Sequence, residues 1–190
     1  MQGTSSLFIT DPLNELNPKK DTTIVWMQEV YEMGGQILQC EMKDLIYKNQ
    51  QTFANCVEIQ DPHHHPQITK KVDDIKQLKD IDYIFMRKDP PVDEDYMNAL
   101  HLLSQAESEG ANVINRSAAL KKFNEKVFAL QFSNWMPDTN VICKEEDFKL
   151  FKNQYSTIIL KPLDGMGLSL IHISEPTRPR LISYAVFCLK

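Results

Sequence analysis

Between residues 82 and 115, two short apolar runs flank a long amphipathic helix, an order that few folds accommodate. The first run, DYIFM at residues 82–86, has the length and composition of a buried strand. Residues 92–109 form the clearest helix, because Tyr96, Leu100, Leu103 and Ala106 recur on one face before Gly110 ends it. Residues 112–115, NVIN, then indicate another strand. Such a strand–helix–strand unit predicts an α/β fold with a parallel sheet and helices on its faces.

The beginning of the chain repeats this order. We expect a strand at residues 7–10, a helix at residues 22–33 and a second strand at residues 36–42. Asp21 or Thr22 can cap the start of that helix, and Gly34 with Gly35 can end it. The methionines and aromatic residues at helical spacing, including Met27 and Met33, are interpreted as core residues.

Two stretches depart from this regular pattern. Residues 44–79 are irregular, and we expect a hairpin at residues 49–59 and a short helix at residues 70–79. After residue 116 the elements become shorter and indicate a second, α+β unit. Its expected elements are helices at residues 117–121 and 124–132, a strand at 137–141, a helix at 145–153 and a strand at 157–161.

Composition excludes several classes of protein. The formal net charge of -5 disfavours nonspecific binding to nucleic acid, which depends on clustered Lys and Arg. No stretch approaches the roughly 20 consecutive apolar residues of a membrane span. The four cysteines form no CxxC pair, so we expect reduced thiols and a cytoplasmic protein. They are Cys40, Cys56, Cys143 and Cys188.

The run His63–His65 is interpreted as a solvated loop rather than a metal site.

Two polar clusters follow predicted parallel strands, where open α/β sheets bind ligands. The first contains Asp11, Asn14, Asn17, Lys19, Lys20 and Asp21. The second is MRKDPP at residues 86–91, in which Arg87 could bind a carboxylate through its planar fork. Spacing alone leaves open that this second segment is only a solvated basic loop before a helix.

A third cluster lies near the end of the regular pattern. Lys161 ends the apolar run TIIL, and residues 164–167, DGMG, follow it. Gly165 and Gly167 would let backbone N–H groups approach phosphate oxygens closely. The segment is neither a Walker A loop nor a GxGxxG fingerprint, so its glycines alone are weak support for a nucleotide site.

Four segments together resemble the bacterial-type glutathione synthetases, which are ATP-grasp ligases. They are DPLNELNPKKD, FMRKDPP, INRSAALKKFNEKVFAL and IILKPLDGMG, and the resemblance covers about residues 5–167. It implies a pre-ATP-grasp parallel-sheet domain at residues 1–122. A truncated ATP-grasp α+β subdomain would follow at residues 123–167.

The resemblance also implies an activity and its participants. The family joins γ-glutamylcysteine to glycine through an acyl phosphate, and uses ATP and Mg²⁺. By position, Lys126 and Lys161 resemble the lysines that bind the ATP phosphates, and Gly165, Met166 and Gly167 resemble the start of the glycine loop. Arg87 resembles a substrate-binding residue. The resemblance assigns no catalytic residue and no metal ligand here, and implies a homo-oligomeric parent enzyme without nucleic-acid or membrane partners.

The family pattern stops after Gly167. Residues 168–178, LSLIHISEPTR, and residues 182–189, ISYAVFCL, resemble a translated transposase-type sequencing adapter. We therefore expect residues 168–190 to be a non-native tail. The magnesium ligands would lie in a missing C-terminal part, so we expect the chain as written to be an inactive fragment.

Two alternatives stay open on the sequence. One is a fragment of another ATP-grasp carboxylate–amine ligase, which the RKDPP and KKD segments disfavour. The other is a non-catalytic α/β binding module that ends naturally near Gly167.

Overall fold

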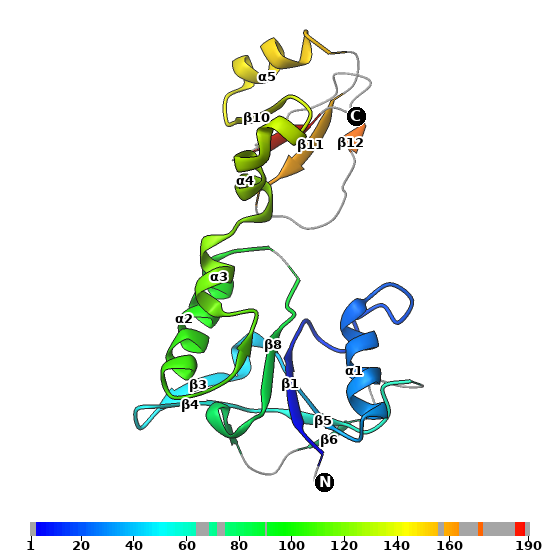
Figure 1. Ribbon diagram of the computed structural model, residues 1–190, viewed down its shortest axis with the longest axis vertical. Coiled ribbons are helices and arrows are strands. Elements are labelled where there is room, and N and C mark those ends of the chain that lie inside the picture. Colours follow the sequence, from blue (N-terminus) through cyan, green and yellow to red (C-terminus); the bar gives the residue numbers. More distant parts are fainter. Residues whose placement is uncertain are drawn as a thin grey trace. The chain divides into compact units, whose positions relative to one another are not determined.

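The chain forms two compact units in the computed structural model (Figure 1). The structure describes residues 3–63, 69–71, 75–89, 91–155, 158–163, 171–172 and 185–188. The first unit comprises residues 1–89 and 93–121, and the second comprises residues 90–92 and 122–190. Among the described residues, the first unit has a six-stranded and a three-stranded sheet with two hydrophobic clusters, and the second unit has one sheet and one cluster.

The main sheet of the first unit has six strands in the order β6-β5-β2-β1-β8-β9. Its parallel centre consists of β1 (Ser5–Ile9), β2 (Gln36–Cys40), β8 (Tyr83–Met86) and β9 (Val113–Ile114). All four strands were expected from the sequence. Two antiparallel strands extend the sheet on one side, β5 (Val57–Ile59) and β6 (Thr69–Lys71).

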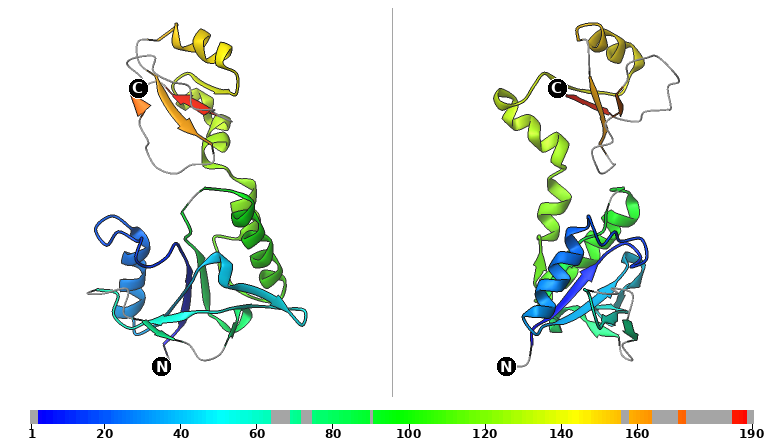
Figure 2. Two further views of the ribbon diagram at one scale, coloured as in Figure 1. Left: turned by 180° about the vertical axis from the view of Figure 1, so that it is seen from behind. Right: turned by 90° about the vertical axis from the view of Figure 1, so that its right-hand side faces the viewer.

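Helices cover both faces of this sheet (Figure 2). The helix α2 (Glu94–Ser108) packs Leu100 and Leu103 into the larger core, which includes Leu7 and Ile9 of β1. The helix α1 (Thr22–Glu32) packs Met27 against Phe8 on the opposite face. Successive strand residues point to opposite faces, so one strand supplies both cores.

The expected boundaries of α1 are confirmed, but one of its expected core residues is exposed. The Asp21 side chain accepts a hydrogen bond from the Thr23 backbone N–H at 2.8 Å, and Gly34 has a φ of +74° after the last turn. Met33 caps the carboxyl end and is 79% exposed. Met33 follows the last residue of α1, so the burial that helical spacing predicted for its side chain was wrong.

Residues 44–79 differ from the expectation. The hairpin pairs β3 (Leu45–Lys48) with β4 (Gln51–Ala54), and its turn residues Asn49 and Gln50 both have positive φ. The expected helix at residues 70–79 was wrong in the described part of that range. Its residues belong to β6, β7 (Lys76–Gln77) and a 3-10 turn at Leu78–Asp80. Pairing with β5 and β4 overrides the local preference of this polar segment.

Two short helical elements complete the first unit. A 3-10 turn at Met42–Asp44 leads into β3, and α3 (Ser117–Lys122) closes the first unit. No helix among the described residues is long and apolar enough to cross a membrane.

The second unit contains a four-stranded sheet in the order β10-β13-β11-β12. Its strands are β10 (Thr139–Ile142), β11 (Ile159–Pro162), β12 (Ile171–His172) and β13 (Ala185–Cys188), and all its pairings are antiparallel. The helix α5 (Glu145–Lys152) packs Phe151 against Ile158 and Leu160. The pieces of residues 168–190 that the structure describes, β12 and β13, are thus paired with strands from the earlier part of the chain.

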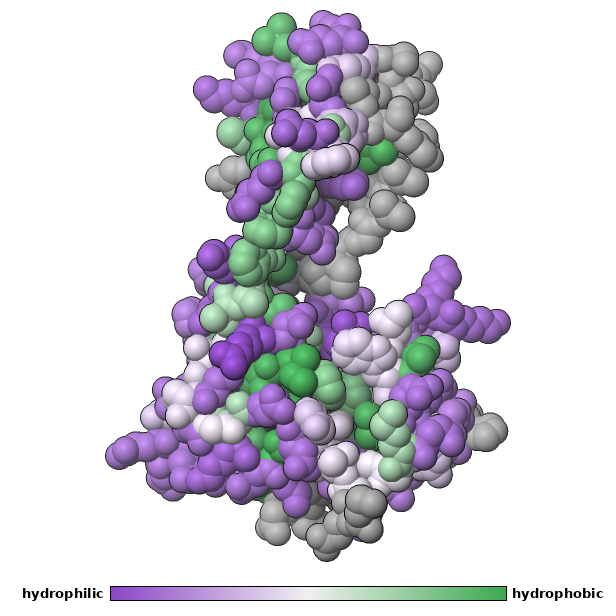
Figure 3. Space-filling view, viewed as in Figure 1, coloured by the Kyte–Doolittle hydropathy of each residue, from purple (hydrophilic) through white to green (hydrophobic). Residues whose placement is uncertain are grey.

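Aromatic side chains line the start of the second unit. The helix α4 (Glu125–Phe128) continues into a 3-10 segment at Ala129–Trp135. The rings of Phe123, Phe128 and Phe132 follow one another at centroid distances of 4.6 and 5.8 Å. Phe123 and Phe132 are 42% and 53% exposed, and hydrophobic surface follows this part of the chain in Figure 3.

Candidate functional site

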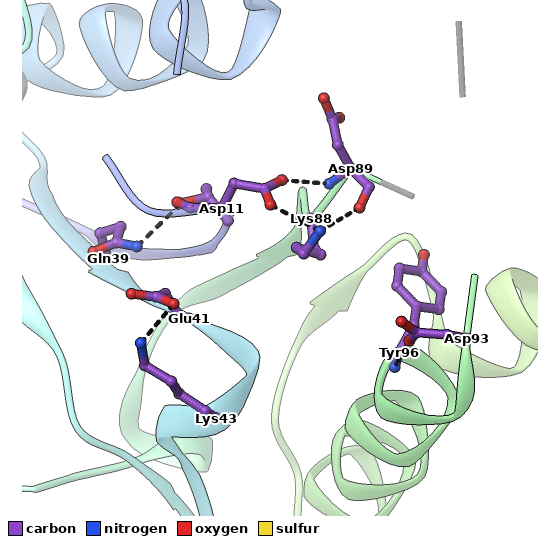
Figure 4. Close-up of polar contacts among 9 residues, drawn as sticks. Asp11, Gln39, Glu41, Lys43, Lys88, Asp89, Asp93 and Tyr96 are labelled. Carbon is purple, nitrogen blue, oxygen red and sulfur yellow. Dashed lines mark hydrogen bonds and ion pairs between the residues drawn. The ribbon is translucent and has the colours of Figure 1, made fainter. Parts of the chain in front are cut away.

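Two loops meet at the carboxyl edge of the parallel sheet in the first unit (Figure 4). Asp11 follows β1, and Lys88 and Asp89 follow β8. The Lys88 ammonium lies 2.8 Å from the Asp11 carboxylate, and the Asp89 backbone N–H donates to the same carboxylate at 3.0 Å. The first two polar clusters therefore come together at the edge where the sequence predicted a ligand site.

The electrostatic balance of this edge is uneven. Partial burial raises the pKa of Asp89, and the nearby charges of Asp21 and Asp11 raise it further. Lys88 and Arg87 act in the opposite direction and do not fully offset this effect. Further negative charge is therefore disfavoured beside Asp89, and an anionic group would bind more favourably beside the two cations.

Arg87 is held by the beginning of α1. Its Nε donates to the Thr23 hydroxyl at 3.1 Å, and its Nη2 donates to the Thr22 hydroxyl at 2.7 Å. The guanidinium also lies over the Trp26 ring, 4.8 Å from its centre. These contacts fix the orientation of the guanidinium. Neither of the two hydrogen bonds involves the third nitrogen, Nη1.

In the second unit, Asn124 connects the two segments that carry the predicted phosphate-binding lysines. Its side-chain oxygen accepts hydrogen bonds from the backbone N–H groups of Lys126 and Val127 at 3.0 and 3.2 Å. Its side-chain nitrogen donates to the Leu163 carbonyl at 3.0 Å. One amide group thus caps α4 and fixes it against the end of β11, two residues after Lys161.

Both lysines are half-buried on these connected segments. A half-buried lysine keeps its methylene stem on apolar surface and its ammonium at the boundary with solvent. Gly165, Met166 and Gly167, the remaining predicted phosphate-binding residues, lie outside the described residues. No group of three or more His, Cys, Asp or Glu side chains that could hold a metal occurs in the part of the chain that the structure describes.

The histidine run contains one described residue. His63 lies 2.9 Å from the Glu32 carboxylate and packs edge-on to the Tyr31 ring. His64 and His65 lie outside the described residues. The described side-chain contacts of His63 are therefore with α1, and its backbone N–H donates to the Asp61 carboxylate at 2.9 Å.

Two models of known protein families match the sequence. The family model described as "Prokaryotic glutathione synthetase, N-terminal domain" matches residues 5–121. The chain belongs to the prokaryotic glutathione synthetase family. The model described as "Prokaryotic glutathione synthetase, ATP-grasp domain" matches residues 125–184, which extends past Gly167, where the sequence resemblance was expected to stop. The two models place the chain among the ATP-grasp ligases that form C–N bonds.

Curated glutathione synthetases are similar to this member of the family over most of its length. The enzyme of Parasynechococcus marenigrum is 39% identical over 168 residues, which are 88% of this chain and 54% of the relative. The enzyme of Vibrio cholerae is 38% identical over 171 residues, with 88% and 53% covered. The chain thus spans about half the length of the curated relatives it matches.

Solved structures show a weaker similarity. The macrocyclase MdnC from Microcystis aeruginosa, bound with precursor peptide MdnA, has a TM-score of 0.48 at 14% identity, with 96% of this chain and 67% of that chain covered. An ATP-grasp ligase from Chryseobacterium gregarium, in complex with ADP and a peptide, has a TM-score of 0.47 at 11% identity, with 97% and 62% covered.

Sequence reasoning missed several residues that position the side chains of this candidate site. Asn124 stands directly before a helix, and this N-cap signal is a local one that the sequence itself contains. Thr22 and Thr23 were seen only as part of a helix start, and Trp26 only as a core residue. Their contacts with Arg87 depend on parallel pairing of β1 with β8, which no local signal reveals.

Proposed function

We propose that this chain is part of an enzyme that uses ATP to join γ-glutamylcysteine and glycine through an acyl phosphate. Membership of the glutathione synthetase family supports the reaction class. The relatives named glutathione synthetase support the substrates. The chain spans about half of those relatives, so the complete reaction is assigned here to a polypeptide of their length.

The observation that carries the nucleotide part of this proposal is the double contact of Asn124. It fixes the start of α4 against the end of β11, so Lys126 and Lys161 stand on connected segments of one unit. ATP supplies the phosphoryl group when it is bound. The two ammonium groups would hold its phosphates and offset their negative charge, which is the main contribution proteins make to phosphoryl transfer.

We assign Gly165, Met166 and Gly167 to the same phosphates on the family resemblance. Backbone N–H groups of a glycine loop can approach phosphate oxygens without a Cβ in the way. Arg87 is assigned to a substrate carboxylate in the first unit. Its contacts with Thr22 and Thr23 support this role, because an oriented guanidinium loses less rotational freedom on binding.

The family also implies magnesium, but the described residues do not fit that ion. Mg²⁺ prefers carboxylate oxygens, and no suitable cluster occurs among the residues that the structure describes. None of the described residues is therefore assigned to the metal. We expect no ligase activity from the 190-residue chain alone, because the charge that develops on the phosphates would be only partly neutralised.

The proposed nucleotide site and the proposed ligase activity are tested by separate experiments. Lys126→Ala and Lys161→Ala should each weaken ATP binding by the 190-residue chain about tenfold, measured by titration calorimetry, because each removes one phosphate contact. Lys149→Ala is the matched control, since Lys149 is exposed on α5 and pairs with Glu145 at 2.7 Å. An equal loss in the control, or no loss in the first two variants, would contradict the assignment.

The activity assay uses γ-glutamylcysteine, glycine, ATP and Mg²⁺ and follows the release of ADP. We expect no release above background with the 190-residue chain. A polypeptide of the relatives' length that begins with residues 1–167 of this sequence and continues in the family pattern should form glutathione. Ligation of γ-glutamylcysteine and glycine by the 190-residue chain would contradict this expectation, because it would show that this chain is sufficient for catalysis.

A further inference from the structure

Two buried cysteines of the first unit lie opposite each other on neighbouring antiparallel segments. The ladder between β2 and β5 pairs Leu38 with Glu58 and Gln39 with Val57. Extending this register by one residue places Cys40 opposite Cys56. Both cysteines are free, both are buried, and both belong to the core that also contains Leu38. Their side chains therefore share one face of the sheet.

The hydrogen bonds of β2 show whether Cys40 and Cys56 form a hydrogen-bonded or a non-hydrogen-bonded pair of the antiparallel ladder. The Cys40 carbonyl accepts from the Thr10 backbone N–H at 3.0 Å, so it faces the first strand rather than β5. Cys40 and Cys56 thus occupy a non-hydrogen-bonded position, where opposed Cα atoms are about 4.5 Å apart and side chains approach closely. Disulfides need Cα separations of about 4.4–6.8 Å, so this position fits without movement of the backbone.

Backbone hydrogen bonds fix the chain at or next to both cysteines. The Thr10 backbone N–H donates to the Cys40 carbonyl at 3.0 Å, and the backbone N–H of Asn55, which precedes Cys56, donates to the Asp44 carbonyl at 3.0 Å. The two sulfur atoms are therefore held near each other by the sheet itself. We propose that Cys40 and Cys56 form a reversible redox pair, a cross-strand disulfide that joins β2 to the segment entering β5.

A low-molecular-weight disulfide such as oxidised glutathione is the oxidant class that this pair would use. A thiolate of the pair attacks one sulfur of the oxidant, breaks its S–S bond and releases one thiolate, which takes up the proton given up by the protein thiol. The second thiolate then attacks the mixed disulfide and releases the other half of the oxidant in the same way. Two protein thiols are oxidised, and one external disulfide is reduced to two thiols.

Burial should make this reaction slow at neutral pH. Burial raises the pKa of Cys40 strongly, and the charges of Asp44, Cys56 and Glu41 raise it further. Burial also raises the pKa of Cys56, where Lys76 acts against it and Asp44 with it. Only thiolates attack, so the rate should rise with pH above neutrality. Access requires opening of β5 and β6, two three-residue strands at the edge of the sheet.

The test uses the full chain with Cys143→Ser and Cys188→Ser, which leaves only the proposed pair. The protein is equilibrated with reduced and oxidised glutathione at mildly alkaline pH, alkylated and digested with trypsin. Cleavage after Lys43 and Lys48 puts the two cysteines on separate peptides. We expect a cross-linked peptide containing Cys40 and Cys56, with both thiols lost together and restored by dithiothreitol. Glutathione adducts on single cysteines without the cross-link would overturn the proposal.

The same equilibrium measured in urea shows whether the fold favours the bond. A disulfide that fits the native sheet should form in the folded chain with an equilibrium constant on the order of a hundredfold larger than in the unfolded chain. The oxidised chain should then also melt at a higher temperature than the reduced chain. A smaller constant in the folded chain would show that the native geometry opposes the bond, and would refute the pair.

Single variants complete the design. Cys56→Ala and Cys40→Ala, each in the same background, retain one buried thiol and should give no intramolecular cross-link. Because either variant could lower stability, far-UV circular dichroism is measured alongside. Loss of one thiol per chain at the rate seen in the parent would mean that the thiols react independently, and would contradict the pair.

Discussion

Arg87 is oriented by contacts that come from a distant part of the sequence. Thr22 and Thr23 accept its hydrogen bonds, and Trp26 packs against its guanidinium. Arg and Lys are not equivalent at such a position, because the planar fork fixes two donors at once. The same residue therefore stabilises the fold and stands at the candidate binding edge.

A double-mutant cycle measures this coupling. Arg87→Ala and Thr22→Ala should each destabilise the first unit, and the pair should show a coupling free energy of about 1 kcal/mol in urea unfolding. The reason is that either variant alone already removes the shared hydrogen bond. Purely additive losses would mean that the 2.7 Å contact contributes nothing to stability.

Asp82 provides a prediction about pH. Hydrogen bonds from the Ser5 backbone N–H at 2.7 Å and from the Ser5 hydroxyl at 2.9 Å lower the pKa of its carboxyl below the ordinary value. A carboxyl with a lowered pKa stabilises the fold above its unfolded pKa, and this stabilisation is lost as pH falls through the folded value. The melting temperature of the parent should therefore fall more steeply below about pH 4 than that of Asp82→Asn. Parallel curves would exclude this contribution.

At the scale of elements, the start of α2 depends on one capping side chain. Asp93 accepts a hydrogen bond from the Tyr96 backbone N–H at 2.9 Å (Figure 4). Tyr96 itself is buried in the core that α2 shares with the sheet. The cap thus fixes the first turn of the helix that follows the Arg87 loop.

Asp93→Ala should lower the free energy of unfolding by about 1 kcal/mol, because a backbone donor loses its acceptor. Asp95→Ala is the matched control, since it removes the same charge from the same exposed turn without a capping bond, at a cost of about 0.3 kcal/mol. Chemical denaturation followed by circular dichroism compares the two. Equal losses would assign the effect to charge rather than to the cap.

At the scale of the whole molecule, the hydrophobic clusters divide along the chain. The two clusters of the first unit draw their buried residues from positions 7–113, and that of the second unit from positions 142–160. We propose that residues 1–122 form an independently stable domain, with residues 123–167 as the start of the ATP-grasp domain and residues 168–190 as a non-native tail.

Calorimetry on residues 1–122 alone and on the full chain tests this proposal. The melting temperature of the first unit should be the same within a few degrees, because the described residues of its two hydrophobic clusters all belong to the first unit itself. The partial second unit exposes apolar surface around Phe123 and Phe132, so the full chain should aggregate more readily on heating. A sharper and higher transition for the full chain would contradict independent folding.

Local sequence was sufficient to establish the order of elements and the family. Hydrophobic periodicity and capping residues are local properties, so β1, α1, β2, β8, α2 and β9 could all be located from the residues within each segment. Motif residues identified Arg87, Lys126 and Lys161 as candidates. Nothing local indicated that Thr69–Lys71 and Lys76–Gln77 would pair as strands where a helix was expected.

Which distant residues meet depended on tertiary packing alone. The contacts of Arg87 with Thr22, the bond from Asn124 to Leu163 and the opposition of Cys40 and Cys56 all require strand pairing or chain packing. Strand pairing has a register, and a shift of one residue turns every side chain to the other face of a sheet. Register is set by the burial of whole faces at once, so no short stretch of sequence contains it.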